Sequence, residues 1–183
     1  KNKDVKIEPY WNLSDIARKG CSNLIETDVE AIERLDSVLR DSVAQQSEAD
    51  VPLGAFLSGG VDSSTIVALM QAQSNRPIET FTIGFDDIKF DESPYAKAVA
   101  QHLGTNHHEL HVTSDDALNL IPSIPELYDE PFSDSSQIPT YFVCKAARKR
   151  VTVALSGDGG DELFGGYNRY LWSQRIWNKL DWM

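Results

Sequence analysis

The sequence predicts an α/β fold with a doubly wound parallel sheet. Apolar runs of strand length alternate with segments of helical periodicity, and this alternation is typical of parallel strands joined by right-handed crossovers. Two of the predicted strands run directly into glycine-rich turns, one at residues 58–64 and one at residues 156–167. Because ligands bind such sheets at the carboxyl ends of the strands, the two turns indicate one shared ligand site.

The N-terminal part of the chain separates into two segments. Residues 1–26 have little periodicity and are interpreted as a linker remnant. Thr27 to Glu30 form a capping-box pattern, in which Glu follows three residues after Thr. Apolar residues then recur at helical spacing, which predicts a helix over residues 28–47.

The remaining elements follow from local signals in chain order. Pro77 precedes the second strand, Pro94 starts a helix that Gly104 ends, and Ser114 caps the helix after the third strand. The predicted strands cover residues 53–57, 78–84, 107–112 and 151–155. The predicted helices cover residues 62–74, 93–103, 135–149, a segment from 114 and a segment from about 167.

The first glycine turn, Ser58-Gly59-Gly60-Val61-Asp62-Ser63-Ser64, lies between a predicted strand and a predicted helix. Glycines let the backbone approach a ligand closely, and the free N–H groups of a first helical turn favour an anion. Asp62 would repel a bare phosphate, which suggests a bridging Mg²⁺. The turn lacks the lysine of a Walker A motif, and without a ligand it would be a serine-rich helix cap.

The second glycine turn carries three carboxylates, those of Asp158, Asp161 and Glu162, among five glycines. A solvated acidic loop would not explain why these carboxylates directly follow an apolar strand. If both turns contact one ligand, the first and fourth strands must be neighbours. The sheet order 3-2-1-4 satisfies this condition, with the switch point between strands 1 and 4.

The two turns, SGGVDSS and SGDGGDELFGGY, together resemble the synthetase domain of glutamine-dependent asparagine synthetases. The resemblance extends from Pro9 to about Tyr170 and includes the strings FTIGF, HLGTNHHE and YDEPF. The first turn is also similar to the pyrophosphate loop of ATP pyrophosphatases. The resemblance implies an adenine nucleotide alpha hydrolase-like (HUP, Rossmann-like) fold, with residues 27–183 as a partial ATP-binding synthetase domain.

The resemblance implies ATP and Mg²⁺ as cofactors and assigns a role to each site residue. Asp62 and Asp161 would hold Mg²⁺. Asp158 would be the catalytic base toward ammonia, at a position where well-known asparagine synthetases carry Glu. Phe56 and Ile83 would contact the nucleotide, or serve only as strand core. The full set of implied ATP-binding residues is Phe56, Ser58, Gly59, Gly60, Asp62, Ser63, Ser64, Ile83, Gly84, Ser156 and Gly157.

The implied activity is that of an asparagine synthase (glutamine-hydrolysing) type ligase. A carboxylate would attack ATP to form an acyl-adenylate, and ammonia would then displace AMP. The ammonia would come from a glutaminase domain that these 183 residues do not contain, so the isolated chain is expected to be incomplete as an enzyme. The default acceptor is aspartate.

The chain departs from those synthetases in one stretch that bears on the acceptor. They carry Thr-Thr-x-Arg before the helix that corresponds to residues 135–149. Residues 131–136 here contain no Arg, so this stretch offers no bidentate clamp for an aspartate carboxylate. The alternatives are an amidotransferase acting on another carboxylate, as in polysaccharide or β-lactam pathways, and a non-catalytic nucleotide-binding domain.

Composition disfavours several classes of partner. The net charge of −11 disfavours nucleic acid and anionic membranes, and no apolar run reaches the length of a membrane span. Cys21 and Cys144 have no metal-ligand or disulfide spacing, which fits a cytoplasmic protein. Cys144 is predicted to be a buried apolar position. The oligomeric state is left open, with a homodimer as one alternative.

Overall fold

The structure is a computed structural model that describes residues 7–87, 91–131 and 133–180. The chain forms two compact units, one up to residue 39 and one from residue 40 onward. The second unit contains both glycine-rich turns, so the candidate site belongs to one unit alone.

The first unit contains helix α1 (Leu13–Ser22) and the start of helix α2 (Asp28–Ser47). The predicted bounds of α2 are confirmed, but no element was predicted before residue 26. Asn12 caps α1, because its side-chain oxygen accepts hydrogen bonds from the N–H groups of Ser14 at 2.9 Å and Asp15 at 3.3 Å. This cap was the available signal for α1. The linker role of residues 1–26 stays a prediction.

The second unit is built on a four-stranded parallel sheet with the order β3-β2-β1-β4, which confirms the predicted order. The strands are β1 (Leu53–Phe56), β2 (Glu79–Phe85), β3 (Asn106–Val112) and β4 (Val153–Leu155). β4 is shorter than predicted, because the N–H of Val151 donates to the carbonyl of Ala147 at 2.9 Å. Val151 is therefore held by the turn that follows α7, and the strand begins only at Val153.

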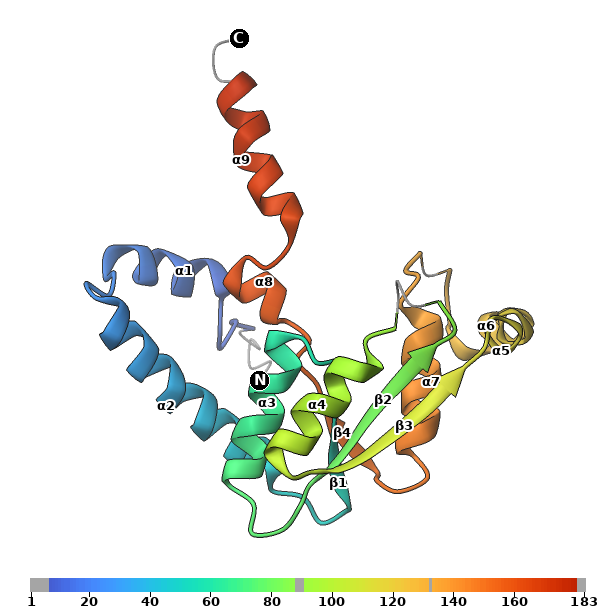
Figure 1. Cartoon of the computed structure of the whole chain (residues 1–183). Coiled ribbons are helices and arrows are strands. Elements are labelled where there is room, and N and C mark those ends of the chain that lie inside the picture. The colour runs from blue at the N-terminus through green and yellow to red at the C-terminus, as the bar shows by residue number, and fades with distance from the viewer. Residues whose placement is uncertain (1–6, 88–90, 132, 181–183) are drawn as a thin grey trace, which may run out of the picture. The chain divides into compact units, whose positions relative to one another are not determined.

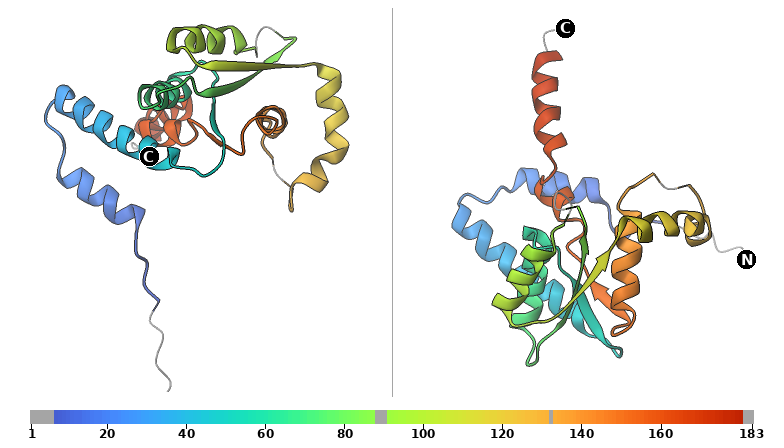
Figure 2. Two further views of the ribbon diagram at one scale, coloured as in Figure 1. Left: turned by 90° about the horizontal axis from the view of Figure 1, so that it is seen from below. Right: turned by 45° about the vertical axis from the view of Figure 1, so that its right-hand side comes forward.

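Helices cover both faces of the sheet (Figure 1, Figure 2), as a doubly wound fold requires. Helices α3 (Val61–Ala72) and α4 (Ser93–Leu103) lie on one face, and α7 (Gln137–Ala147) lies on the other. Among the described helices, none has the combination of length and apolar character that crossing a bilayer requires.

Shorter elements complete the second unit. After β3 come α5 (Ser114–Leu120), the 3-10 turn η1 (Ile121–Ser123) and α6 (Ile124–Leu127). The second glycine-rich turn contains a short helix, α8 (Gly160–Phe164), that the sequence did not predict. The chain then continues into α9 (Asn168–Leu180).

The core of the second unit lies between the sheet and its helices. Phe81 of β2 has no exposed surface and packs with Ala147 and Val151. The prediction that Cys144 is buried is wrong, because its side chain is exposed. The buried residues of helix α7 are Phe142 and Ala147. Position 144 lies on a different side of this helix, which faces solvent.

We expect Phe81→Ala to lower the free energy of unfolding by about 3–5 kcal/mol, because it leaves a cavity at the centre of the sheet. Phe164→Ala is the matched control, since Phe164 is 60% exposed and surface substitutions change stability by only about 0.5 kcal/mol. Urea unfolding of both variants measures the difference. Equal losses in the two variants would contradict the burial of Phe81.

Candidate active site

The two glycine-rich turns meet at the point where the strand order reverses. β1 and the edge strand β4 are neighbours in the sheet, and residues 57–60 and 156–159 follow their carboxyl ends. A cavity of about 1010 Å³ opens there, in the second unit. The predicted site residues that line it are Phe56, Ser58, Asp62, Ser63, Ile83, Ser156, Gly157, Asp158 and Asp161.

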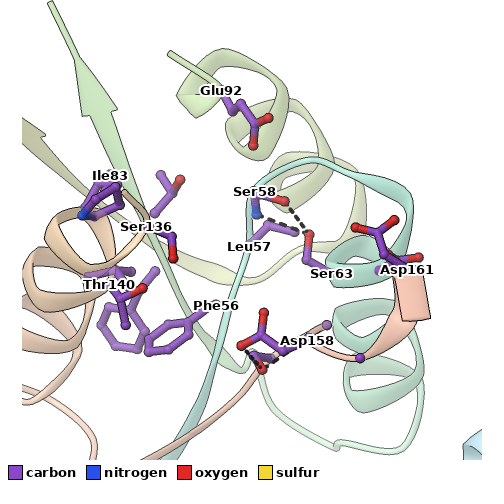
Figure 3. A pocket seen from close by; sticks show the side chains of 18 of the residues that line it. Phe56, Leu57, Ser58, Ser63, Ile83, Glu92, Ser136, Thr140, Asp158 and Asp161 are labelled. Carbon is purple, nitrogen blue, oxygen red and sulfur yellow. Dashed lines mark hydrogen bonds between the residues drawn. The ribbon is translucent and has the colours of Figure 1, made fainter. Parts of the chain in front are cut away.

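The first turn is tied to the start of α3 by hydroxyl groups (Figure 3). The hydroxyls of Ser58 and Ser63 lie 2.9 Å apart, and the backbone N–H of Ser58 donates to Ser63 Oγ at 3.2 Å. The N–H of Gly60 donates to Ser58 Oγ at 3.2 Å. Gly60 is the N-cap of α3. The first-turn N–H groups of the helix therefore have no intrahelical acceptor and favour an anion.

Gly59 holds this turn against α4 and could not be replaced by a residue with a side chain. Its φ of 82° lies in the left-handed region. A Cβ atom on Gly59 would lie 2.6 Å from the Cβ of Tyr95 and 2.7 Å from the N of Ala96. The sequence predicted a close backbone approach to a ligand here, whereas the structure shows a close approach to a helix of the same chain.

The second turn packs directly onto the first turn of α3. A Cβ atom on Gly157 would lie 2.7 Å from the backbone N of Ser63. A Cβ atom on Gly160 would lie 2.6 Å from Oδ2 of Asp62. The Asp62 carboxylate thus lies against the residue that precedes Asp161, and two acidic residues distant in sequence come to the same place.

This pair of acidic residues is compatible with Mg²⁺. In proteins Mg²⁺ usually takes one or two carboxylates and completes its shell with water and substrate phosphates. Asp62 and Asp161 both line the cavity and meet that requirement. Within the described ranges, no cluster of three or more His, Cys, Asp or Glu side chains could hold a metal ion by itself.

Asp158 lies in the second turn and is oriented by its own neighbour. Its Oδ2 accepts a hydrogen bond from Ser156 Oγ at 3.0 Å, and its backbone N–H donates to the same hydroxyl at 3.3 Å. The carboxylate is exposed to solvent and lines the cavity beside Phe56 (Figure 3). It is therefore accessible to a small nucleophile that enters the cavity.

The strand residues of the predicted site divide between the two faces of the sheet. Phe56 and Ile83 are half-buried, line the cavity and also pack on core clusters. Gly84 faces the other way, where a Cβ atom would lie 3.0 Å from Ser93 Oγ. Gly59, Gly60, Ser64 and Gly84 lie outside the cavity lining. Their contacts with a nucleotide stay predictions.

The sequence singled out residues 131–136 as bearing on the acceptor, but it did not identify the cavity wall that this stretch forms with α7. Ser136, Pro139, Thr140 and the preceding Asp134 line the cavity. The N–H of Ser136 donates to Asp134 Oδ1 at 2.8 Å, and this hydrogen bond lowers the pKa of Asp134. The Asp-x-Ser pattern before a helix was a usable signal for a turn, but the direction in which it faces depends on how α7 packs.

Three further residues near α8 also line the cavity: Glu162, which the sequence showed in the acidic turn without assigning it a role, and Tyr167 and Arg169, which received no role either. The hydroxyl of Tyr167 donates to Glu162 Oε1 at 2.7 Å, which lowers the pKa of Glu162 and raises the pKa of Tyr167. The guanidinium carbon of Arg169 lies 3.9 Å from the centre of the Tyr167 ring. All three side chains line the cavity.

A family model and two known proteins that match this chain are described as asparagine synthases or synthetases. The family model described as asparagine synthase matches residues 34–183. Putative asparagine synthetase [glutamine-hydrolyzing] 2 of Methanocaldococcus jannaschii is 43% identical over 175 residues, which cover 95% of this chain and 33% of that protein. Asparagine synthetase [glutamine-hydrolyzing] 1 of Bacillus subtilis is 42% identical over 139 residues, which cover 76% of this chain and 22% of that protein. The chain thus spans a third or less of these relatives.

Solved structures share the fold. The NH3-dependent NAD synthetase of Campylobacter jejuni superposes with a TM-score of 0.51 at 11% identity, over 74% of this chain and 60% of that one. The NMN synthetase of Francisella tularensis superposes with a TM-score of 0.50 at 16% identity, over 78% of this chain and 59% of that one. These likenesses confirm the predicted adenine nucleotide alpha hydrolase-like fold.

We expect Gly157→Ala to lower the free energy of unfolding by about 1–3 kcal/mol, because the new methyl group would push the two turns apart. Gly20→Ala is the control, since open space surrounds that helical glycine and Ala favours a helix. Urea unfolding compares the two. A Gly157→Ala protein as stable as the parent would show that the turns do not touch.

Proposed function

The chain belongs to the asparagine synthase family, and we propose on that premise that its cavity binds ATP and activates a carboxylate for amide formation. The observation that carries this proposal is the contact between the two glycine turns, which brings Asp62 and Asp161 to the N-terminus of α3. The cavity of about 1010 Å³ is at the upper end of the usual range for small-molecule sites. It therefore has room for a nucleotide and a small acid together.

Different parts of the cavity wall are suited to the adenosine and to the phosphates of the nucleotide. Phe56 and Ile83 offer apolar surface for the adenosine, with Gly84 on the same strand as Ile83. Ser58, Gly59, Gly60, Ser63 and Ser64 surround the α3 N-terminus, which suits the β- and γ-phosphates. Ser156 and Gly157 lie between these ends and suit the ribose and the α-phosphate. Asp62 and Asp161 would hold Mg²⁺, which would offset the negative charge of the phosphates.

The proposed reaction has two steps. A carboxylate oxygen attacks the α-phosphorus of ATP and releases pyrophosphate, and ammonia then attacks the acyl-adenylate and releases AMP. The protein mainly positions the groups and stabilises developing charge. In the second step Asp158 accepts a proton from the attacking ammonia. The names of the relatives state that they hydrolyse glutamine, and we propose glutamine as the source of the ammonia here.

Aspartate is the proposed acceptor by family membership, and one observation favours a second candidate. The α7 wall presents hydroxyls from Ser136 and Thr140 together with the carboxylate of Asp134, and residues 131–136 contain no Arg. A carboxylate acceptor without a second anionic group would meet less repulsion there. ATP–pyrophosphate exchange by the full-length protein, measured with aspartate and with a panel of other acids, identifies the acceptor. Nucleotide binding without exchange for any acid would indicate a non-catalytic binding domain.

We expect Asp62→Asn and Asp161→Asn each to lower ATP–pyrophosphate exchange by at least about 100-fold, because each removes one proposed metal carboxylate. Asp115→Asn is the control, since Asp115 is exposed on α5, away from the cavity lining. Circular dichroism checks that the variants fold. Exchange close to the parent rate in either variant would remove that residue from the metal site.

We expect Asp158→Asn to spare pyrophosphate exchange and to lower ammonia-dependent amide formation by about 10²–10⁴-fold, the usual contribution of a general base. Asp158→Glu is the conservative control, because it keeps the carboxylate and should retain much of the activity. Both steps are measured in each variant. Equal losses in the two steps of Asp158→Asn would place Asp158 with the phosphate or metal ligands instead.

A further inference from the structure

The cavity contains one positively charged side chain among its described lining residues, that of Arg169. The same lining carries six carboxylates, from Asp62, Glu92, Asp134, Asp158, Asp161 and Glu162. We propose that Arg169 binds the pyrophosphate that leaves ATP, and that it is a catalytic residue of the first step. This inference rests on the proposed function and adds to it a residue that neither glycine turn contains.

The charge of the cavity creates the need for such a residue. ATP and pyrophosphate are polyanions, and a wall with six carboxylates repels them. A metal ion and the N–H groups of α3 offset part of this repulsion. A guanidinium group can offset the remaining repulsion, because its planar donors bind phosphate oxygens in pairs and it stays protonated at any physiological pH.

The contacts of Arg169 place it toward the phosphate end of the cavity. Its guanidinium stacks on Tyr167, with 3.9 Å from the guanidinium carbon to the ring centre. The hydroxyl of Tyr167 is hydrogen-bonded at 2.7 Å to Glu162, and Glu162 adjoins Asp161 in α8. Asp161 in turn follows Gly160, which packs on the Asp62 carboxylate. This series of contacts leads from Arg169 to the carboxylates at the start of α3.

Arg169 attracts the Glu162 carboxylate electrostatically, which adds to the lowering of the Glu162 pKa, but the two side chains are not in ion-pair contact. Within the described residues, no carboxylate forms an ion pair with it. It also lies in the first turn of α9, where the helix dipole disfavours a cation. A ligand anion would satisfy both the guanidinium donors and the positive end of the helix.

The bond changes of the first step show where Arg169 would act. An oxygen of the acceptor carboxylate forms a bond to the α-phosphorus of ATP. The bond from the α-phosphorus to the bridging oxygen of the β-phosphate breaks, and its electron pair stays on that oxygen. Negative charge therefore grows on the pyrophosphate as it leaves, and a guanidinium held beside it by Tyr167 stabilises that growing charge.

The test uses the full-length protein with Arg169→Gln, Arg169→Lys and the control Arg175→Gln. Arg175 lies on the same helix and stacks on Trp172 at 5.7 Å, but it is not part of the cavity lining. Two quantities are measured: the rate of ATP–pyrophosphate exchange, and the affinity for magnesium pyrophosphate by calorimetry. We expect Arg169→Gln to lower exchange by about 10- to 100-fold and to weaken pyrophosphate binding about 10-fold. Arg169→Lys should lie between it and the parent, and Arg175→Gln should match the parent.

Several outcomes would overturn the inference. Arg169→Gln could match the parent in both measurements, which would make the stack on Tyr167 a surface contact only. It could raise the KM of the acceptor acid and leave pyrophosphate affinity unchanged, which would place Arg169 at the acceptor. A parent protein that binds no magnesium pyrophosphate would also overturn it. The parent could bind magnesium pyrophosphate but show no exchange with any acid, while Arg169→Gln binds pyrophosphate more weakly than the parent. In that case the proposed function fails and the anion site stands.

Discussion

The candidate site depends on one close contact between two glycine turns. Gly157 lies against the backbone of Ser63, and Gly160 lies against the carboxylate of Asp62. A side chain at position 157 would meet the backbone of Ser63, and one at position 160 would displace the Asp62 carboxylate, so glycine at both positions permits this approach. It brings β4 and its loop onto the N-terminus of α3, and the anion-binding N–H groups and the acidic residues then face one cavity. A larger residue at either position would separate these groups.

The chemistry of the cavity follows from its unbalanced charge. An acidic wall that receives a polyanion needs counter-charges, and each of them acts at a different point along the ligand. In the proposed complex the helix N-terminus would offer partial positive charge at the phosphates, a divalent cation between Asp62 and Asp161 would add more, and Arg169 would add the charge of a lining side chain. Such an arrangement favours a reaction in which negative charge moves away from the α-phosphorus.

The acceptor side of the cavity differs in character from the phosphate side. Hydroxyls from the N-terminal end of α7 and the carboxylate of Asp134 form this wall, and the hydrogen bond from the backbone N–H of Ser136 lowers the pKa of that carboxyl. A wall of this kind binds hydroxyl or amine groups more readily than a second carboxylate. Under the proposed function, acceptor choice would depend on α7, whereas nucleotide binding would depend on the two turns.

The sequence by itself determined the sheet order, the α2 bounds and the position of both glycine turns. The α2 bounds and the turns depend on local periodicity, capping and turn residues, which are encoded over a few neighbouring positions, whereas the sheet order followed from the condition that both turns contact one ligand. Only the tertiary structure decided which side chains share the cavity. It placed Tyr167 and Arg169 in the lining and Gly84 on the opposite face, and it exposed Cys144. These outcomes depend on how α7, α8 and α9 pack, and a pattern within one segment does not contain the direction in which it packs.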